Sequence, residues 1–261
     1  MNREPSLQEQ VWSVARRSAT VALRQRALLL FPMVFPLILF AINGSALSRA
    51  TAIRGFPTHN YRDFLIAMPF VQGAMFVAIS AGTSLARDIE TGFLNRLALT
   101  PLRSEAMLIG QLGGAFVLAC IQSVVYLLVG LATGVGFASG FPGVIVLLCL
   151  SLVISFAFAN LGGLAALRLG SGEAVQGIFP LFFVTLFLSS SSLPRNLIKV
   201  DWFREIATYN PISYLLEGLR SLVITGWDGK ALALAFGFAL AISAIALGLS
   251  DRAMKTRLAR A

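Results

Sequence analysis

Charged side chains are scarce in this chain of 261 residues, making up 13% of it, while 57% of the residues are hydrophobic. A soluble domain of this size carries roughly a quarter charged residues. The mean hydropathy of +0.79 is also far above that of ordinary soluble proteins. The composition therefore excludes a typical soluble domain and indicates an integral membrane protein.

Side chains that bind metals or perform catalysis are few as well. His59 is the only histidine, and the two cysteines, Cys120 and Cys149, lie inside apolar runs, where small buried hydrophobes are the ordinary interpretation. The sequence thus predicts no metal site, no disulfide framework and no catalytic residue, although a membrane-embedded enzyme that uses His59 is an alternative. A G-x4-G-K-[ST] phosphate-binding loop is also absent. An ATP-driven process would have to use the ATPase of another chain.

Five stretches contain no charged residue: 27–47, 64–86, 106–167, 174–194 and 231–250. About 20 apolar residues cross a bilayer as a helix, so the stretch 106–167 is too long for one crossing. It contains a glycine-rich segment with Pro142, which favours a turn. We therefore predict one all-α domain over 1–261, with six transmembrane helices at 27–47, 64–86, 106–133, 143–167, 174–193 and 231–250.

The net charge of +9 first suggests a nucleic-acid partner, but the positions of the basic residues argue against one. If both termini are cytoplasmic, 13 of the 21 Lys and Arg residues lie on the cytoplasmic side and eight on the other side. This distribution follows the positive-inside rule of membrane proteins. We expect a multi-pass protein of a bacterial cell membrane with both termini in the cytoplasm.

Residues 6–25 form an amphipathic pattern before the first predicted span. Trp12 lies near the boundary between the two faces, and Arg16 and Arg17 lie on the polar face. Such a helix suits the membrane surface, with its arginines against lipid headgroups. A soluble surface helix is the alternative.

The segment 87–105 is short, charged and amphipathic, and it joins the second and third predicted spans. Leu94 and Leu97 offer apolar surface, while Asp88, Glu90 and Arg96 offer polar contacts. The segment is either a docking surface for a partner or a solvated connecting loop.

A second segment, 194–230, carries signals of short helices between spans five and six. Asn210 suits an N-cap and Pro211 the first helical position, so a helix should begin there. Glu217 and Arg220 are then i, i+3 neighbours that can pair. With a further short helix predicted near 201–207, the segment is either a pair of re-entrant helices on the extracellular side or an ordinary surface loop.

Both segments resemble one family. The pattern Asp88-x3-Gly92-x3-Arg96-x4-Pro101 is similar to the cytoplasmic-loop signature of ABC-2 type permeases, nearest the drug-resistance branch with the daunorubicin-type exporters. The spacing Asn210-Pro-x5-Glu217-x2-Arg220 resembles the same family. Asn95 stands where many members have an acidic residue, which leaves the partner contact at that position open.

The resemblance implies the permease subunit of an ATP-driven exporter, without a nucleotide site of its own. ATP and Mg²⁺ would be bound by two partner ATPase subunits, and a second permease chain, identical or different, would complete the pathway. The residues implied as the ATPase-coupling helix are Arg87, Asp88, Glu90, Gly92, Leu94, Arg96, Leu97, Thr100 and Pro101. Those implied as an extracellular gate are Asn210, Pro211, Glu217 and Arg220.

The predicted spans lack charged residues, which weakens the alternative of an ion-driven carrier. An apolar pathway favours a hydrophobic or amphipathic substrate, such as a drug, a polyketide or a lipid, and a lipid-linked polysaccharide is the alternative substrate. Large side chains on the spans either line this pathway or pack helices together: Met75, Phe76, Phe182, Phe183 and Phe187.

Overall fold

The structure is a computed structural model that describes residues 16, 20, 26–92 and 113–258. All regular elements in these residues are helices. The longer ones are α2 (Arg26–Ala46), α4 (Ala67–Glu90), α7 (Gly113–Ala132), α8 (Gly140–Leu169), α12 (Pro211–Ile224) and α13 (Gly229–Leu258). The shorter ones are α3 (Tyr61–Leu65), α9 (Gly172–Gly177), α10 (Phe179–Phe187), α11 (Asp201–Tyr209) and the 3-10 helices η1 (Ser48–Ala52) and η2 (Arg195–Leu197).

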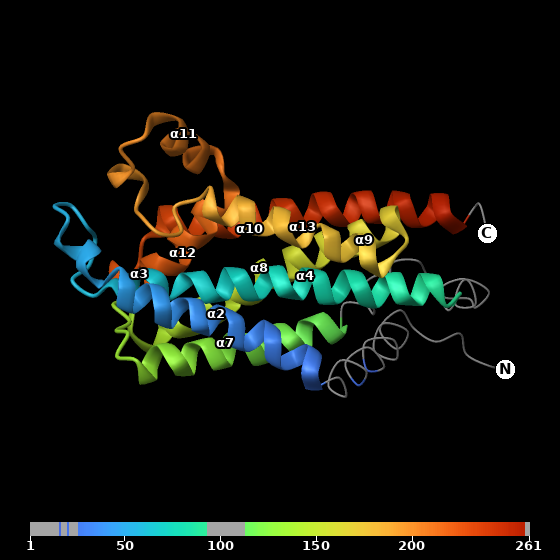
Figure 1. The fold of residues 1–261 in the computed structure, drawn as a ribbon, viewed down its shortest axis with the longest axis horizontal. Coiled ribbons are helices and arrows are strands. Elements are labelled where there is room, and N and C mark those ends of the chain that lie inside the picture. The colour runs from blue at the N-terminus through green and yellow to red at the C-terminus, as the bar shows by residue number, and fades with distance from the viewer. Residues whose placement is uncertain (1–15, 17–19, 21–25, 93–112, 259–261) are drawn as a thin grey trace.

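Helices α2, α4, α7, α8 and α13 lie side by side and alternate in direction along the chain, with α9 and α10 together forming the pass between α8 and α13 (Figure 1). Helices α3, α11 and α12 gather at one end of this bundle, which we call the α12 end. The opposite end, where α4 and α8 finish and α9 begins, we call the α9 end. This arrangement places two segments that are far apart in the sequence, 87–92 and 168–173, at the same end.

Four helices in the described ranges are long and apolar enough to cross a membrane: Tyr61–Glu90, Gly113–Ala132, Gly140–Leu169 and Gly229–Met254. They coincide with the predicted spans 64–86, 106–133, 143–167 and 231–250, apart from residues 106–112, which lie outside the described residues. Two shorter apolar helices, Leu30–Ala46 and Gly172–Phe187, lie in the remaining predicted spans. The all-helical prediction is therefore confirmed for the part of the chain that the structure describes.

The fifth predicted span differs from the sequence prediction. It is not one helix over 174–193 but two, α9 and α10, which are separated at Ile178, and α10 ends at Phe187. Pro180, near the start of α10, has no N–H to continue the hydrogen bonds of α9. Beyond Phe187 the backbone carbonyls bond to side chains of α12 instead of to a further helical turn.

The centre of the bundle is the crossing of α4 and α8, where two glycines allow the backbones to approach. A Cβ atom on Gly162 would lie 1.9 Å from the carbonyl oxygen of Ala78, and one on Gly82 would lie 2.7 Å from the carbonyl oxygen of Gly162. Close backbone approach through small residues is the usual way that helices pack in lipid. The two helices also make the most extensive interhelical contact in the described residues.

Helix α2 contains Pro32 and Pro36, and the second proline leaves a backbone carbonyl without its helical donor. That carbonyl belongs to Pro32, and the hydroxyl of Tyr126 on α7 donates a hydrogen bond of 2.8 Å to it. Ser123 and Ser151 link α7 to α8 at 2.9 Å, and Asn160 donates to Ser243 at 2.9 Å to link α8 to α13. Polar side chains thus join the apolar helices at their interfaces.

Large apolar side chains remain exposed along the outside of the bundle. On α2 they recur every four residues, at Leu30, Val34, Ile38 and Ile42, and α7, α8, α10 and α13 carry others. Contiguous apolar surface of this kind marks contact with a membrane or with another protein.

Candidate functional site

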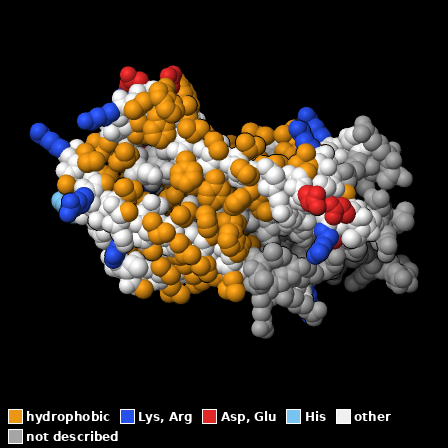
Figure 2. Space-filling model, viewed as in Figure 1, with side chains coloured by type: hydrophobic (Ala, Val, Ile, Leu, Met, Phe, Trp, Pro, Cys, Tyr) orange, Lys and Arg blue, Asp and Glu red, His pale blue; other side chains and the backbone are white. Residues whose placement is uncertain are grey.

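Six phenylalanines of α2, α4 and α10 form a continuous set of ring contacts, which we call the aromatic face: Phe31, Phe35, Phe76, Phe179, Phe183 and Phe187. Neighbouring ring centroids lie 4.8 to 6.3 Å apart, within the range of favourable aromatic pairs. Phe31 and Phe187 are more than half exposed, at 61% and 53%. In the view of Figure 2, hydrophobic side chains cover the middle of the molecule, where α2 and α10 lie.

Three of the five residues proposed for the pathway belong to this face. Phe183 contacts both Phe76 and Phe187, with each pair of ring centroids 6.3 Å apart. Met75 instead is fully buried in the core, and Phe182 packs against Phe158 of α8.

Phe31, Phe35 and Phe179 are members of the aromatic face that were not predicted from the sequence. A signal was present, because the phenylalanines of α2 and of α10 repeat at the i, i+4 spacing that puts them on one side of a helix.

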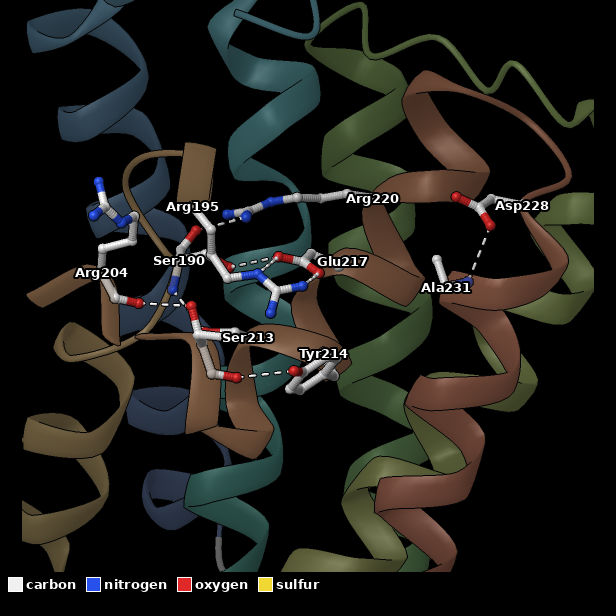
Figure 3. A network of polar contacts seen from close by, with 10 residues as sticks. Ser190, Arg195, Arg204, Ser213, Tyr214, Glu217, Arg220, Asp228 and Ala231 are labelled. Carbon is white, nitrogen blue, oxygen red and sulfur yellow. Dashed lines mark hydrogen bonds and ion pairs between the residues drawn. The ribbon is translucent and has the colours of Figure 1, made fainter. Parts of the chain in front are cut away.

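The end of α10 joins α12 through the segment Ser189–Ser192, and we call this contact region the α10–α12 junction. Its central side chain is Arg220, which is 5% exposed. The guanidinium donates to the carbonyl oxygens of Phe64, Ser190 and Ser191 at 2.8, 2.6 and 2.6 Å. Figure 3 shows its contact with Ser190. It also lies 3.6 Å from the ring centroid of Phe64. One side chain thus ties three chain segments together.

Burial lowers the pKa of Arg220 to about 9. The guanidinium is therefore still charged at neutral pH, and its three hydrogen bonds are charge-assisted, which makes each stronger than a neutral one.

Asn210 joins the same two helices on the other side of the junction. Its side-chain oxygen accepts the N–H of Ile212 at 2.9 Å, so it caps α12, and Pro211 is the first residue of that helix, as the sequence predicts. Its side-chain nitrogen donates to the carbonyl oxygens of Thr185 and Leu188 at the end of α10. The predicted cap is therefore also a link between helices.

Glu217 has a different partner from the one that the sequence suggests. Instead of Arg220, it binds Arg195 of η2, which donates from Nε at 2.7 Å and also from a terminal nitrogen (Figure 3). The guanidinium of Arg195 lies 4.5 Å from the ring centroid of Tyr214. Burial lowers the pKa of Arg195, but the hydrogen bonds and charge interactions with Glu217 and Tyr214 together outweigh this effect and raise the pKa above its usual value. The ion pair fastens the loop after α10 to α12.

A cavity of about 380 Å³ opens at this junction. Its walls include the charged side chains of Arg195, Glu217 and Arg220 and the ring of Phe64. The four residues proposed as a gate thus lie around one region at the α12 end, and the cavity adds Arg195 to them.

At the α9 end, the structure describes only four residues of the predicted coupling helix. Arg87 is exposed, Asp88 is buried, and α4 ends at Glu90, ahead of Gly92 with its φ of 67°. Glu90 Oε1 accepts a hydrogen bond of 2.9 Å from the N–H of Gly172, the first residue of α9. The remaining coupling residues, Leu94, Arg96, Leu97, Thr100 and Pro101, lie outside the described residues.

The predicted surface helix 6–25 also falls largely outside the described residues, including Trp12 and Arg17. Arg16 is helical and exposed, and its carbonyl oxygen accepts a hydrogen bond from the hydroxyl of Thr20.

Comparison with known proteins gives a consistent result. Residues 9–224 match the ABC-2 type transporter family. The chain is 27% identical over 202 residues to the daunorubicin resistance ABC transporter permease protein DrrB1 of Streptomyces coeruleorubidus, covering 75% of this chain and 67% of the relative. It is 23% identical over 156 residues to the probable doxorubicin resistance permease DrrC of Mycobacterium tuberculosis, covering 60% and 55%. The probable multidrug permease YbhR of Escherichia coli is 27% identical over 174 residues, covering 64% and 45%. Since the family match extends over most of the chain, this protein belongs to the ABC-2 type transporter family.

Proposed function

We propose that this chain is the membrane permease subunit of an ATP-driven exporter of hydrophobic or amphipathic molecules. The observation that carries the proposal is the aromatic face, a partly exposed apolar surface between α2, α4 and α10 in a chain of the ABC-2 type transporter family. The relatives are named for daunorubicin resistance, doxorubicin resistance and multidrug transport, which supports a substrate of this class.

The proposed topology has six spans, with α2 and the α9–α10 pair crossing the membrane beside the four longer helices. The alternating directions of the helices support it, because each pass brings the chain back to the opposite end (Figure 1). In this topology the α9 end is cytoplasmic, both termini lie on that side, and the α12 end is extracellular. Helices α11 and α12 are then the proposed re-entrant elements.

The proposed energy source is a separate ATPase that binds ATP and Mg²⁺. Segment 87–105 would be its docking site, because it begins in the last turn of α4, the helix that also contributes to the aromatic face. When two ATPase subunits close on ATP, each would move this segment in one of two permease chains. The movement would tilt α4 and so change the position of its side chains in the pathway.

The proposed substrate route runs along the aromatic face, between two copies of the permease or between this chain and a similar one. A flat aromatic molecule can stack on phenylalanine rings, and an acyl chain can lie across them, without any buried charge. The exposure of Phe31 and Phe187 leaves room for such contacts. Phe183 lies between Phe76 and Phe187 and is the proposed centre of the route.

The α10–α12 junction is the proposed extracellular gate. Asn210, Glu217 and Arg220 hold the end of α10 or the loop that follows it, so release of the substrate would require these contacts to rearrange. Pro211 fixes where α12 begins.

The test is co-purification of the chain from its native membrane in mild detergent, followed by identification of the bound proteins. The expected result is a nucleotide-binding subunit in equal amount, which is lost when Leu94 and Leu97 are both replaced by Ser. Arg54→Ala is the control, because Arg54 is exposed and follows η1, which contacts α3 at the α12 end. A preparation without any nucleotide-binding protein would overturn the proposal.

A further inference from the structure

The α9 end contains a contact between two distant parts of the sequence that the family pattern does not assign. Glu90, the last residue of α4, accepts the N–H of Gly172 at 2.9 Å, although 82 residues separate them. Glu90 therefore bonds to a residue of its own chain. Both Glu90 and Arg87, which lies one turn earlier on α4, are exposed, and Arg87 carries a positive charge where Glu90 carries a negative one.

We propose that Glu90 is a positioning residue that transmits movement of segment 87–105 to α9 and α10. This inference rests on the proposed function, since it requires a partner ATPase to move that segment. The role assigned to Glu90 is different from direct docking, because its carboxylate holds the start of α9 in place.

The packing around α9 supports such a transmission. Val175 of α9 is 1% exposed and belongs to the same apolar cluster as Leu85 and Ala86 of α4. A Cβ atom on Gly82 would lie 2.7 Å from Val175 Cγ1, so the two helices are in close contact along this stretch. Helix α9 thus contacts α4 in two places. Val175 packs against α4 inside the bundle, and the N–H of Gly172 bonds to Glu90 at the end of α4.

The path from α9 to the aromatic face is short. Only Ile178 separates α9 from α10, and α10 carries Phe179, Phe183 and Phe187. A displacement at the end of α4 can therefore reach these rings through one hydrogen bond and a six-residue helix. Since α9 is separated from α10 at Ile178, the two helices can also change their relative angle.

The backbone around Gly172 allows a substitution that removes the donor and little else. Gly172 occupies the first helical position, where proline is well tolerated, and the preceding Ser171 has an extended backbone with φ of −132° and ψ of 144°, as a residue before proline requires. No atom lies within 4 Å of a Cβ placed on Gly172. Gly172→Pro therefore deletes the N–H at a position whose backbone accepts proline. The proline Cδ takes the place of the hydrogen, so the exposed Glu90 side chain must turn away, which breaks the same contact. Gly172→Ala is its control.

The carboxylate of Glu90 allows a matched pair of substitutions as well. Glu90→Gln keeps an oxygen that can accept the N–H of Gly172 but removes the charge. Glu90→Ala removes the acceptor. If Glu90 served as a charge for the partner ATPase, both substitutions would be harmful, whereas the positioning role predicts harm from Glu90→Ala alone.

The experiment uses the permease purified with its ATPase and reconstituted in lipid. The reporter is the thiol introduced by Thr185→Cys on the exposed side of α10, after both native cysteines have been replaced by Ser. The measured quantity is the ATP-dependent change in the rate of its reaction with a small maleimide, with ATP hydrolysis measured in the same sample. This readout does not require the transported molecule to be known.

Glu90→Ala and Gly172→Pro should each reduce the ATP-dependent change roughly two- to tenfold, the factor that one hydrogen bond is worth, while hydrolysis continues. Glu90→Gln and Gly172→Ala should behave as the unaltered protein. The double variant Glu90→Ala/Gly172→Pro should be no worse than either single variant, because both remove the same contact.

Two results would overturn the inference alone: a full response in Gly172→Pro, or equal loss in Glu90→Gln and Glu90→Ala. Additive losses in the double variant would also count against it. If the unaltered complex shows no ATP-dependent change at α10, the proposed coupling itself fails, and the inference fails with it.

Discussion

Replacing Arg220 by Met tests whether its buried guanidinium holds the α10–α12 junction together. Methionine has similar length and fits an apolar environment, but it cannot donate a hydrogen bond. The carbonyl oxygens of Phe64, Ser190 and Ser191 would all lose their charged donor. The contact with the ring of Phe64 would lose its cation–π character.

The expected loss can be bounded from these contacts. A buried acceptor left without a donor costs about 1–3 kcal/mol, so three of them cost about 3–9 kcal/mol if none is rehydrated. Removing the charge also stabilises the folded protein by several kcal/mol, because burying a guanidinium is itself unfavourable. We therefore expect a net loss of about 1–4 kcal/mol in the free energy of unfolding, below the sum for three unpaired acceptors.

The measurement is unfolding in mixed detergent micelles, with Arg204→Met as the control. Arg204 pairs with Asp201 on the exposed side of α11, and exposed pairs contribute about 0–1 kcal/mol. Arg220→Lys should give an intermediate loss, because one ammonium cannot reach all three carbonyl oxygens in the geometry of the planar guanidinium. If Arg220→Met is no more destabilising than Arg204→Met, Arg220 does not hold the junction together.

Three further substitutions test the fold and the proposed route. Gly162→Ala should destabilise the bundle by about 3 kcal/mol or more, because its Cβ would lie 1.9 Å from a carbonyl oxygen of α4, whereas Gly163→Ala should be nearly neutral, with its nearest neighbouring atom at 3.9 Å. Tyr126→Phe should lower the free energy of unfolding by about 0.5–2 kcal/mol, since a carbonyl of α2 loses its hydrogen bond. Phe183→Ala should reduce ATP-driven uptake of a hydrophobic fluorescent dye into inverted vesicles, while Phe116→Ala, at an exposed site on α7 outside the aromatic face, should leave it unchanged. Equal uptake in both would remove the aromatic face from the route.

The features that the sequence predicts well are those encoded locally. Charge-free apolar runs give the positions of the long helices, because the length needed to cross a bilayer is a property of each run alone. The start of α12 is predicted for the same reason, since Asn210 and Pro211 carry the capping chemistry themselves. The end of α8 also follows local rules, as Gly170 adopts the left-handed conformation with φ of 75°.

The features that sequence reasoning missed depend on residues far apart in the chain. The partner of Glu217 is Arg195 rather than its helical neighbour Arg220, because η2 folds back over α12. The i, i+3 spacing indicates only that two residues on a helix can meet, not that a third residue competes for the contact. Pro180 indicates the break between α9 and α10, but the absence of charged residues over 174–194 favoured one continuous span.

The contacts of α10 suggest which part of the bundle moves. Helix α8 packs extensively against α4 on one side and against α13 on another, and these helices form the rigid part of the bundle. Helix α10 makes far fewer contacts, mainly with α4 and α9, although it carries half of the aromatic face. Its position is instead set at its two ends, by Arg220 and Asn210 at the junction and through α9 at the opposite end. Elements with few packing contacts require the least free energy to move. We therefore expect α10 to change position relative to α8 when either end contact is altered, which joins the proposed gate and the proposed coupling site through a single helix.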